Sequence, residues 1–377
     1  MKKNTCRKEE MGYLLYDSSS KKYILEEKVE PNTPYRMIEN SQDYDNTLSA
    51  PLTVFLELTK QCDLNCKHCF RDNNDSNDLC TNEWFYIIDQ LHDYGVCSVK
   101  ITGGEPFLRP DIKNILQYLD YHSIDYIIFT NGFILENNID WLKELTHLVC
   151  IRVSIDGTEK TNDIIRGAGS WERAISSILL LERYRIPCEI NYTITKQNYK
   201  ELPSLSNELL TRGINSNIHT GFVKYAGNAK GNIEQCFISN QEIYQASYEI
   251  KEYQRIYSNI SELHLLKPIY YKIFGNIYGC PAGRTSMTIK QDGTVIPCGI
   301  LPKNAFSCGN IIHDGLHTVW NNTTMLSLSN IDVYKKCETC KYLFVNCTGG
   351  CRGNAFNYHD KLDGEDINCS VYQVFCN

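Results

Sequence analysis

Short apolar runs alternate with amphipathic segments between residues 50 and 225. Segments with apolar residues three and four positions apart predict helices. The helix over 82–94 has Thr81 as its N-cap and ends before Gly95, and the helix over 171–184 has Ser170 as its N-cap. The other expected helices are 111–121, 139–145 and 202–212. The apolar runs between them predict strands over 54–59, 99–102, 126–130, 148–154, 189–195 and 217–223.

Strands that alternate with helices in this way predict parallel β/α units with right-handed crossovers. The expected fold class is therefore α/β, with a partial (β/α)6 barrel similar to a TIM barrel. Functional residues of such barrels gather at the carboxyl ends of the strands. Four polar or glycine-containing segments follow expected strand ends, namely 62–69, Gly103–Glu105, Thr130–Gly132 and Ser154.

Two other regions show the pattern of a β-hairpin. Apolar and polar residues alternate within 287–298 on both sides of Asp292-Gly293. This pattern predicts a hairpin with these two residues as its turn. Residues 12–16 and 22–26 predict a second hairpin near the N-terminus.

Composition limits the class of protein. The 377 residues are 42% hydrophobic and 22% charged, which is typical of a globular chain long enough for two domains. No run approaches the ~20 apolar residues of a membrane-spanning helix. The N-terminus lacks the apolar core of a secretory signal, so we expect a cytoplasmic protein without a membrane partner. A net charge of −7 argues against nucleic acid as a partner.

The unusual number is 18 cysteines. The cytosol keeps thiols reduced, so ligation of a metal or cluster is favoured over disulfides. Cys62, Cys66 and Cys69 form a C-x3-C-x2-C triplet, and no further cysteine follows until Cys80. Three such thiolates can hold three corners of a [4Fe–4S] cluster and leave one iron open, whereas zinc sites close with four ligands. His68 is a weaker candidate ligand because it would crowd the same face of the loop.

A second motif, Gly103-Gly104-Glu105-Pro106, ends the next expected strand. Adjacent glycines let the backbone approach a ligand closely, and the carboxylate can receive an ammonium group. Alone, this tetrapeptide is more typical of a surface turn. In combination with the cysteine triplet, the sequence resembles the radical S-adenosylmethionine (SAM) superfamily.

The resemblance implies a cofactor site. The three cysteines would bind a [4Fe–4S] cluster whose open iron is chelated by SAM, and Gly103–Pro106 would contact the SAM amino group. Phe70 would lie against the adenine. Ser154 and Arg166 match residues that contact the ribose and carboxylate, although a strand-end cap and a solvated charge would also explain them. Residues that would complete this pocket are Asn191, Thr193 and the segment 224–231.

The second group of cysteines is C-terminal. Cys280 and Cys298 flank the predicted hairpin, and five more follow with the spacing Cys337-x2-Cys340-x6-Cys347-x3-Cys351-x17-Cys369. Taken alone, the pair with two intervening residues is typical of zinc. The seven cysteines in this order resemble instead the SPASM domain, which would carry two auxiliary [4Fe–4S] clusters and bring the total to three.

The SPASM resemblance also implies the ligands of each auxiliary cluster. Those of auxiliary II would be Cys337, Cys340, Cys347 and Cys369. Those of auxiliary I would be Cys280, Cys298 and Cys351. This second set lacks a fourth cysteine, because residues 271–279 contain none. The fourth position is either open or filled by Cys308, Cys236 or Cys376.

These patterns divide the chain into four parts. We expect an N-terminal extension over 1–50, a radical SAM core over 51–235, a helical linker over 236–273 and a SPASM domain of hairpin, short helices and loops over 274–377. The extension is too short to be a complete winged-helix module of the kind with which peptide maturases bind a leader peptide. It can be a remnant of one, an edge that accepts a peptide strand, or packing for the barrel.

The resemblance implies radical chemistry on a ribosomally synthesised peptide. One electron from the cluster would split SAM and give a 5′-deoxyadenosyl radical, which abstracts hydrogen from a residue of the precursor peptide. The auxiliary clusters would then accept an electron, giving a crosslink, a thioether or an oxidised residue. A flavodoxin- or ferredoxin-type protein would supply the electrons.

Three alternatives remain open. Sulfatase-maturating relatives have an Asp directly after the hairpin cysteine, where this chain has Gly299, so formylglycine formation is less favoured. A small-molecule dehydrogenase is also compatible. A non-catalytic iron–sulfur electron-transfer protein would leave the Gly103–Pro106 motif unexplained. No general base can be assigned, although the conceivable candidates are Asp156, Glu189 and Asp292.

Overall fold

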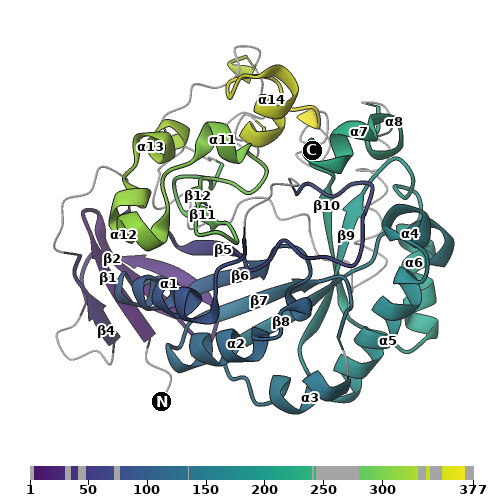
Figure 1. Cartoon of the computed structure of the whole chain (residues 1–377), viewed down its shortest axis with the longest axis horizontal. Helices are drawn as coiled ribbons and strands as arrows, with labels where there is room; N and C mark the ends of the chain where they lie inside the picture. The colour runs from purple at the N-terminus through teal and green to yellow at the C-terminus, as the bar shows by residue number, and fades with distance from the viewer. Residues whose placement is uncertain are drawn as a thin grey trace.

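The computed structural model describes residues 4–29, 35–40, 48–71, 77–134, 136–239, 242, 280–329, 337–339 and 350–369. Its main feature is a sheet with the strand order β10-β9-β8-β7-β6-β5-β11-β12 (Figure 1). The strands from β5 to β10 are parallel, which confirms the predicted partial barrel. They are β5 (Thr53–Glu57), β6 (Ser98–Thr102), β7 (Asp125–Thr130), β8 (Leu148–Ser154), β9 (Cys188–Ile194) and β10 (Asn217–Phe222).

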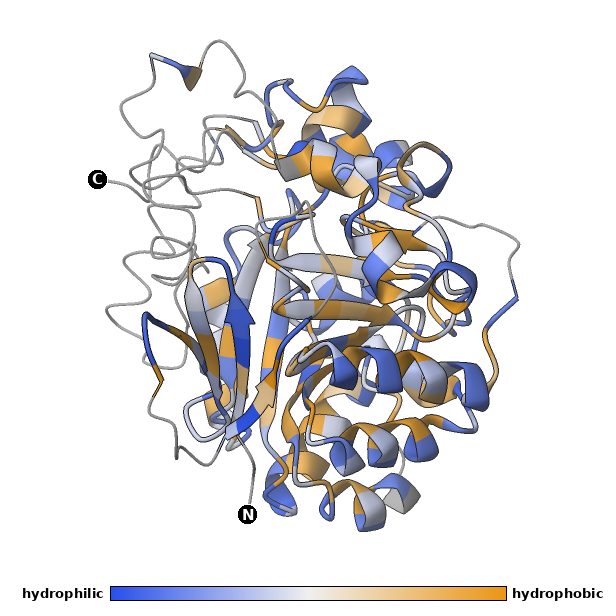
Figure 2. Ribbon diagram, turned by 90° about the vertical axis from the view of Figure 1, so that its left-hand side faces the viewer, coloured by the Kyte–Doolittle hydropathy of each residue, from blue (hydrophilic) through white to orange (hydrophobic). Residues whose placement is uncertain are grey.

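Helices follow these strands and cover one face of the sheet. They are α1 (Thr81–Asp93), α2 (Ile112–Tyr121), α3 (Glu136–Leu142), α4 (Glu159–Arg166), α5 (Ser170–Arg183) and α6 (Leu202–Thr211), with a 3₁₀ turn η1 at Pro106–Leu108. In Figure 2 the orange, hydrophobic sides of the helices turn toward the sheet and the blue sides turn outward. The sequence predicted all of these helices except α4, and it placed α3 three residues too late.

Side chains on each strand alternate between the helix-covered face and the inside of the barrel. On β5, Val54 and Leu56 are fully buried in the core that the helices share. Phe55 and Glu57 point to the opposite face, where the Lys100 ammonium lies 4.8 Å from the centre of the Phe55 ring. The inside of the barrel therefore carries polar and charged groups, whereas the main apolar core lies between sheet and helices.

The C-terminal hairpin extends this sheet. Strand β11 (Ser286–Ile289) pairs in parallel with β5 and antiparallel with β12 (Val295–Ile296). The predicted two-residue turn is wrong, because the register pairs Ile289 with Val295 and Lys290 N donates to Thr294 O (2.8 Å), which leaves a three-residue loop. Of the two expected turn residues, Gly293 alone has a positive φ (81°), as a three-residue loop with a glycine bulge requires.

A second, four-stranded sheet is formed near the N-terminus, in the order β3-β2-β1-β4 (Figure 1). The predicted hairpin is confirmed as β2 (Gly12–Asp17) and β3 (Lys22–Glu26). The sequence did not predict β1 (Asn4–Glu9) and β4 (Tyr35–Ile38), which pair in parallel with each other.

Short helices complete the described structure. They are α7 (Asn228–Gly231), α8 (Ile233–Cys236), α11 (Lys303–Phe306), α12 (Ile311–Trp320), α13 (Thr323–Ser329) and α14 (Arg352–His359). None of the helices described is long and apolar enough to cross a membrane. Nearly all of the expected linker over 236–273, and with it Cys340, Cys347 and Cys376, lies outside the described residues.

Candidate active site

The cysteine triplet lies on the loop that leaves the carboxyl end of β5. Cys62, Cys66 and Cys69 are all half-buried. Burial is the main cause that raises the pKa of the Cys66 thiol to about 11; Arg166 opposes this increase, and the nearby Cys69 and Cys62 thiols contribute to it. A bound metal cluster would reverse this increase at Cys66 by taking the sulfur as a thiolate. The predicted set therefore fits an iron–sulfur cluster.

Backbone contacts hold the loop in place from the side of α4. Lys67 N donates to the carbonyl oxygen of Ile165 (3.0 Å), and the Cys66 thiol lies 3.9 Å from the carbonyl oxygen of Arg166. The unpredicted helix α4 thus supports the loop through its last turn.

Helix α7 closes the loop on another side. Asn228 N donates to the carbonyl oxygen of Cys69 (2.8 Å), and its side-chain amide donates to that of Cys66 (3.0 Å). The Asn232 amide donates to the carbonyl oxygen of Lys67 (3.3 Å). The segment expected to line the SAM pocket therefore also fastens the cysteine loop.

The glycine pair lets two loops pair along their backbones. Gly104 N donates to Thr59 O (2.6 Å) and Glu105 N to Gln61 O (2.7 Å). A side chain on Gly104 would overlap the carbonyl oxygen of Gln61, so only glycine permits this approach. The Gly103–Pro106 motif is thereby placed directly beside the cysteine loop, as the sequence predicted for one site.

Glu105 is fully buried and its carboxylate is held by protein donors. It accepts from Phe107 N (3.0 Å), Thr130 Oγ1 (2.9 Å) and Asn131 N (2.7 Å). Burial raises its pKa to about 7 against these hydrogen bonds. The carboxylate fixes the end of β7 at the site, and the expected contact of this motif with the SAM amino group stays a prediction.

Arg166 is part of a buried charged group behind the cysteines. Its guanidinium lies 2.6 Å from the carboxylate of Asp156, which also accepts from Thr193 N (2.7 Å) and lies 3.3 Å from His68 Nε2. Burial lowers the pKa of His68 to about 4, so the imidazole is neutral at pH 7. Strand register places Ser154 directly beside Asn191 on neighbouring strands of the same barrel face.

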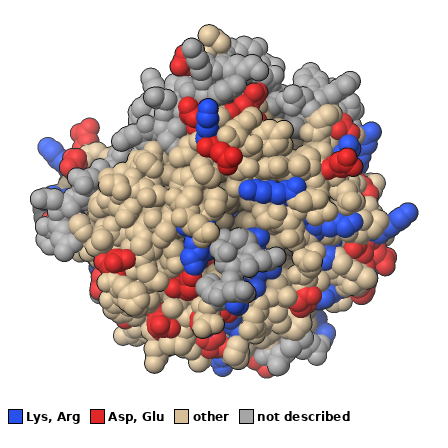
Figure 3. Space-filling view, turned by 45° about the horizontal axis from the view of Figure 1, so that its top comes forward, with Lys and Arg blue, Asp and Glu red and all other residues tan. Residues whose placement is uncertain are grey.

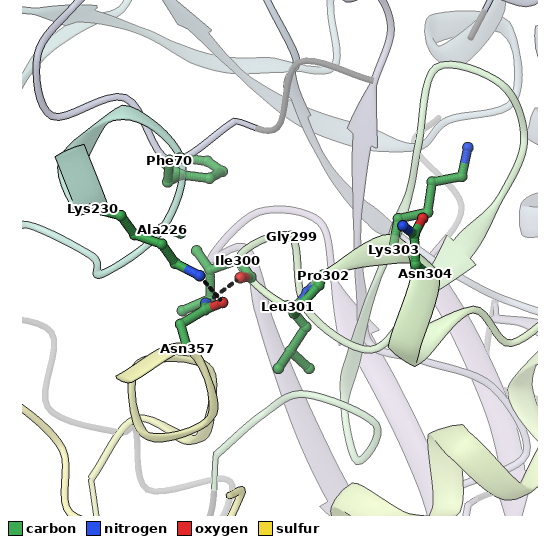
Figure 4. Close-up of a pocket in the computed structure, with 11 residues that line it drawn as sticks. Phe70, Ala226, Lys230, Gly299, Ile300, Leu301, Pro302, Lys303, Asn304 and Asn357 are labelled. Atoms are coloured by element: carbon green, nitrogen blue, oxygen red, sulfur yellow. Dashed lines mark hydrogen bonds between the residues drawn. The ribbon is translucent and has the colours of Figure 1, made fainter. Parts of the chain in front are cut away.

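A cavity of about 200 Å³ opens next to this loop (Figure 4). Phe70 forms one wall, and Gly299 with the residues after it forms the opposite one. At one side the Lys230 ammonium donates to Asn357 Oδ1 (2.8 Å). The side-chain amide nitrogen of Asn357 in turn donates to the carbonyl oxygen of Ile300 (2.7 Å). The lining residues are Phe70, Ala226, Gly227, Lys230, Gly299, Ile300, Leu301, Pro302, Lys303, Asn304 and Asn357.

The cysteines expected to hold auxiliary I also converge. Burial is the main cause that raises the pKa of the Cys298 thiol to about 12, and the nearby Cys280 and Cys351 thiols contribute to this increase. Burial acts to lower the pKa of Lys224, but Cys351, Asp366, Cys298 and Cys280 hold it above its usual value. A half-buried cation among three half-buried thiols fits the charge of an iron–sulfur cluster with thiolate ligands.

The other expected cysteine ligands are only partly described. Cys337 and Cys369 are half-buried. Within the described residues, no group of three His, Cys, Asp or Glu side chains is arranged to hold a single metal ion.

Of the three cysteines that could be the fourth auxiliary I ligand, the two that the structure describes pack elsewhere. Cys308 is buried in the main apolar core with Ile311 and Val319. The Cys236 thiol donates to the carbonyl oxygen of Lys67 (3.6 Å), beside the radical SAM loop. An open position and Cys376, which lies outside the described residues, therefore stay as predictions for auxiliary I.

The three conceivable bases are all engaged in ion pairs. Asp156 is paired with Arg166, and Asp292 is paired with Lys303. Burial acts to raise the pKa of Glu189, but His219 and Arg152, each 2.8 Å away, lower it to about 2. The sequence overlooked a further buried carboxylate, Glu57, because its partner Lys290 is 233 positions away.

Charge on the face shown in Figure 3 is mixed. Basic and acidic side chains are interspersed there, without a continuous basic patch.

Comparison with known proteins identifies the class. The profile of the radical SAM superfamily matches residues 56–209, and that of the iron–sulfur cluster-binding SPASM domain matches residues 280–341. The chain belongs to the radical SAM superfamily and carries a C-terminal SPASM domain, as the sequence motifs predicted. It is accordingly an enzyme that uses SAM with a [4Fe–4S] cluster and one or more auxiliary clusters.

The individual relatives have low sequence identity to this chain but align with most of its length. Mycofactocin maturase MftC of Mycobacterium tuberculosis is 27% identical over 89% of this chain and 86% of its own length. The AdoMet-dependent heme synthase of Methanosarcina barkeri is 28% identical over 82% of this chain and 93% of its own. The crystal structure of Streptococcus suis SuiB shares the fold with a TM-score of 0.77 at 21% identity, covering 98% of this chain and 99% of that one.

Proposed function

We propose that this enzyme is a peptide maturase that oxidises or crosslinks a residue of a ribosomally synthesised precursor peptide. The observation that carries the proposal is the cavity, whose walls come from the loop of Phe70 and from the segment directly after Cys298. A residue that enters it lies between the SAM-binding loop and the expected auxiliary I site. Support also comes from MftC, a maturase, and from SuiB, which has been crystallised with its precursor peptide SuiA.

The residues of the chain have distinct roles in this proposal. Cys62, Cys66 and Cys69 hold the cluster that, with bound SAM, supplies a 5′-deoxyadenosyl radical. Phe70 and the Gly103–Pro106 motif orient SAM, the former by stacking on the adenine. The remaining expected SAM contacts are Ser154, Arg166 and Asn191.

The auxiliary ligands are assigned in the same proposal. Cys280, Cys298 and Cys351 hold auxiliary I with one open position, which can bind a thiolate or amide of the substrate. Auxiliary II takes Cys337, Cys340, Cys347 and Cys369, two of which lie outside the described residues. Three clusters correspond to about 12 iron atoms per chain.

Partners follow from this chemistry. A flavodoxin- or ferredoxin-type donor supplies electrons, and the expected location is the cytoplasm, where thiols are kept reduced. The exposed β3 edge of the N-terminal sheet offers a place for a leader peptide to add as a strand.

The test is anoxic reconstitution followed by assay with SAM, a reductant and each short peptide that the neighbouring genes are found to encode. The proposal predicts 5′-deoxyadenosine together with a change in peptide mass that requires the cysteine triplet. Cys66→Ala should abolish both. A wild-type enzyme that cleaves SAM but leaves every neighbouring peptide unchanged, while modifying a porphyrin precursor, would place it instead with the small-molecule enzymes.

A further inference from the structure

Lys230 is a basic residue of the cavity that has no role in the account above. Its ammonium donates to Asn357 Oδ1 (2.8 Å) at one side of the cavity (Figure 4) and lies 5.8 Å from the centre of the Tyr225 ring. Among the described residues, Asn357 is the only hydrogen-bond partner of this ammonium. An ammonium carries three N–H groups, so donors remain for a further acceptor in the cavity.

The charge of Lys230 is not offset by the cavity lining. None of the 11 lining residues is Asp or Glu. The other lysine of the lining, Lys303, is paired with Asp292, and in Figure 4 its ammonium points away from Lys230 and Phe70. No acidic side chain of the described residues pairs with Lys230, so the described lining favours an anionic group.

Contacts on two sides fix where this ammonium lies. Lys230 belongs to α7, which is fastened to the cysteine loop because Asn228 N donates to Cys69 O (2.8 Å). On the other side, the partner Asn357 is itself held by its hydrogen bond to the carbonyl oxygen of Ile300 (2.7 Å). A lysine held in this way is a more preorganised binding group than one that extends into solvent.

The rest of the lining suits carbon atoms beside an anionic group. Ile300, Leu301 and Pro302 are apolar, and the Phe70 ring lies across the cavity from them. Methylene groups of a bound residue can pack on these walls while its charged end faces Lys230. Apolar walls with one oriented charge are typical of a site that selects its ligand.

We propose that Lys230 binds a carboxylate of the peptide substrate and so selects the residue that enters the cavity. This inference rests on the proposed function and names the chemical class of its substrate residue. A carboxylate is the anion that an unmodified peptide offers, either on an Asp or Glu side chain or at the C-terminus. Both kinds are ionised at pH 7, and their oxygens accept the N–H groups that Asn357 leaves.

The test measures the binding of three probes to full-length, reconstituted enzyme with SAM by equilibrium dialysis. Acetyl-Gly-Glu-Gly amide carries a side-chain carboxylate, acetyl-Gly-Gly-Gly carries a C-terminal one, and acetyl-Gly-Gln-Gly amide is neutral. At least one carboxylate probe should bind about tenfold more tightly than the neutral probe, as expected of one charge-assisted hydrogen bond. The probe that binds identifies the source of the carboxylate, and equal binding of all three would overturn the inference.

Variants assign this preference to the lysine. Lys230→Met should remove it and Lys230→Arg should keep it, and high salt should weaken it in the wild-type enzyme. The control is Lys143→Met, which removes an exposed lysine paired with Asp140 and should leave the preference unchanged. An unchanged preference in Lys230→Met would overturn the inference. So would weaker SAM binding in that variant, because the lysine would then serve the cofactor.

The same contact can be measured with a precursor peptide that the enzyme modifies. Lys230→Met should raise the KM for the peptide about tenfold with little change in kcat, because the contact binds substrate and transition state equally. Replacing the substrate carboxylate by an amide should have the same effect, and the two changes together should add little. Full additivity would contradict the inference. Failure to modify any peptide, with the probe preference intact, would count against the proposed function instead.

Discussion

Lys224 shows how single residues can tune this site. Hydrogen bonds fix the backbone on both sides of it, because Asn368 donates to Val223 O (3.1 Å) and Tyr225 N donates to Asn354 Oδ1 (2.9 Å). Asp366 in turn accepts from Cys351 N (2.7 Å). The lysine is therefore held against the segment that carries an expected auxiliary I ligand.

We predict that Lys224→Met makes the reduction potential of auxiliary I more negative. A nearby cation stabilises the reduced, more negative cluster, so its removal disfavours reduction. Redox titration followed by electron paramagnetic resonance measures the effect, and Lys224→Arg should retain the wild-type potential. Lys230→Met is the matched control, because that lysine bonds to Asn357 instead. Equal potentials in Lys224→Met and wild type would contradict the prediction.

The sequence was most informative about the site where the residues concerned are close to one another along the chain. The cysteine loop could be recognised because Cys62, Cys66 and Cys69 lie within a few positions of one another. The Glu57–Lys290 pair could not, since only the pairing of β11 with β5 brings these residues together. The engagement of Arg166 with Asp156 was equally hidden, because a sequence does not show which buried charges pair.

At the scale of elements, α7 acts on the cysteine loop through its asparagines. We predict that Asn228→Ala weakens binding of the radical SAM cluster. The variant loses the side-chain hydrogen bond to Cys66 O, which contributes about 1 kcal/mol to fixing the loop. After anoxic purification without reconstitution, iron content should fall by up to about four atoms per chain.

Asn357→Ala is the control for this prediction. Its amide bonds to the carbonyl oxygen of Ile300, away from the cysteine triplet, so iron should stay at the wild-type level. A full complement of iron in Asn228→Ala would show that the helix does not support the loop.

Elements with a clear hydrophobic period were predictable, and those without one were not. The parallel strands were found because their apolar runs are buried on the helix-covered face. Helix α4 was overlooked because two of its three buried residues, Asn162 and Arg166, are polar. The hairpin loop has three residues where the sequence predicted two, because Asp-Gly is compatible with both a two-residue turn and a three-residue loop with a bulge.

At the scale of the whole molecule, a buried network joins the N-terminal sheet to the barrel. Asp125 accepts from Tyr16 Oη (2.7 Å), from the Lys21 ammonium (2.5 Å) and from His147 Nδ1 (2.9 Å). Burial acts to raise the pKa of Asp125, but these hydrogen bonds hold it below its usual value.

This network makes a pH-dependent contribution to stability. A depressed pKa in the folded state stabilises the protein above the unfolded value of about 3.9, and the contribution is lost as pH falls through the folded pKa. Asp125→Asn should therefore cost about 3 kcal/mol of unfolding free energy at pH 7 and progressively less below about pH 4.

Melting curves of the two proteins from pH 7 to pH 3 measure this difference. Asp140→Asn, which removes an exposed carboxylate paired with Lys143, should leave the melting temperature unchanged. A difference between Asp125→Asn and wild type that stays constant across this range would contradict the assignment.

The central claim is that Cys62, Cys66 and Cys69 hold a cluster with one iron free for SAM. The most direct measurement is the electron paramagnetic resonance spectrum of anoxically reconstituted, dithionite-reduced protein before and after addition of SAM. Replacing the auxiliary I ligands Cys280, Cys298 and Cys351 by alanine simplifies the spectrum. We predict that SAM shifts the remaining signal of the triplet's cluster. A reduced spectrum that SAM leaves unchanged would contradict the account.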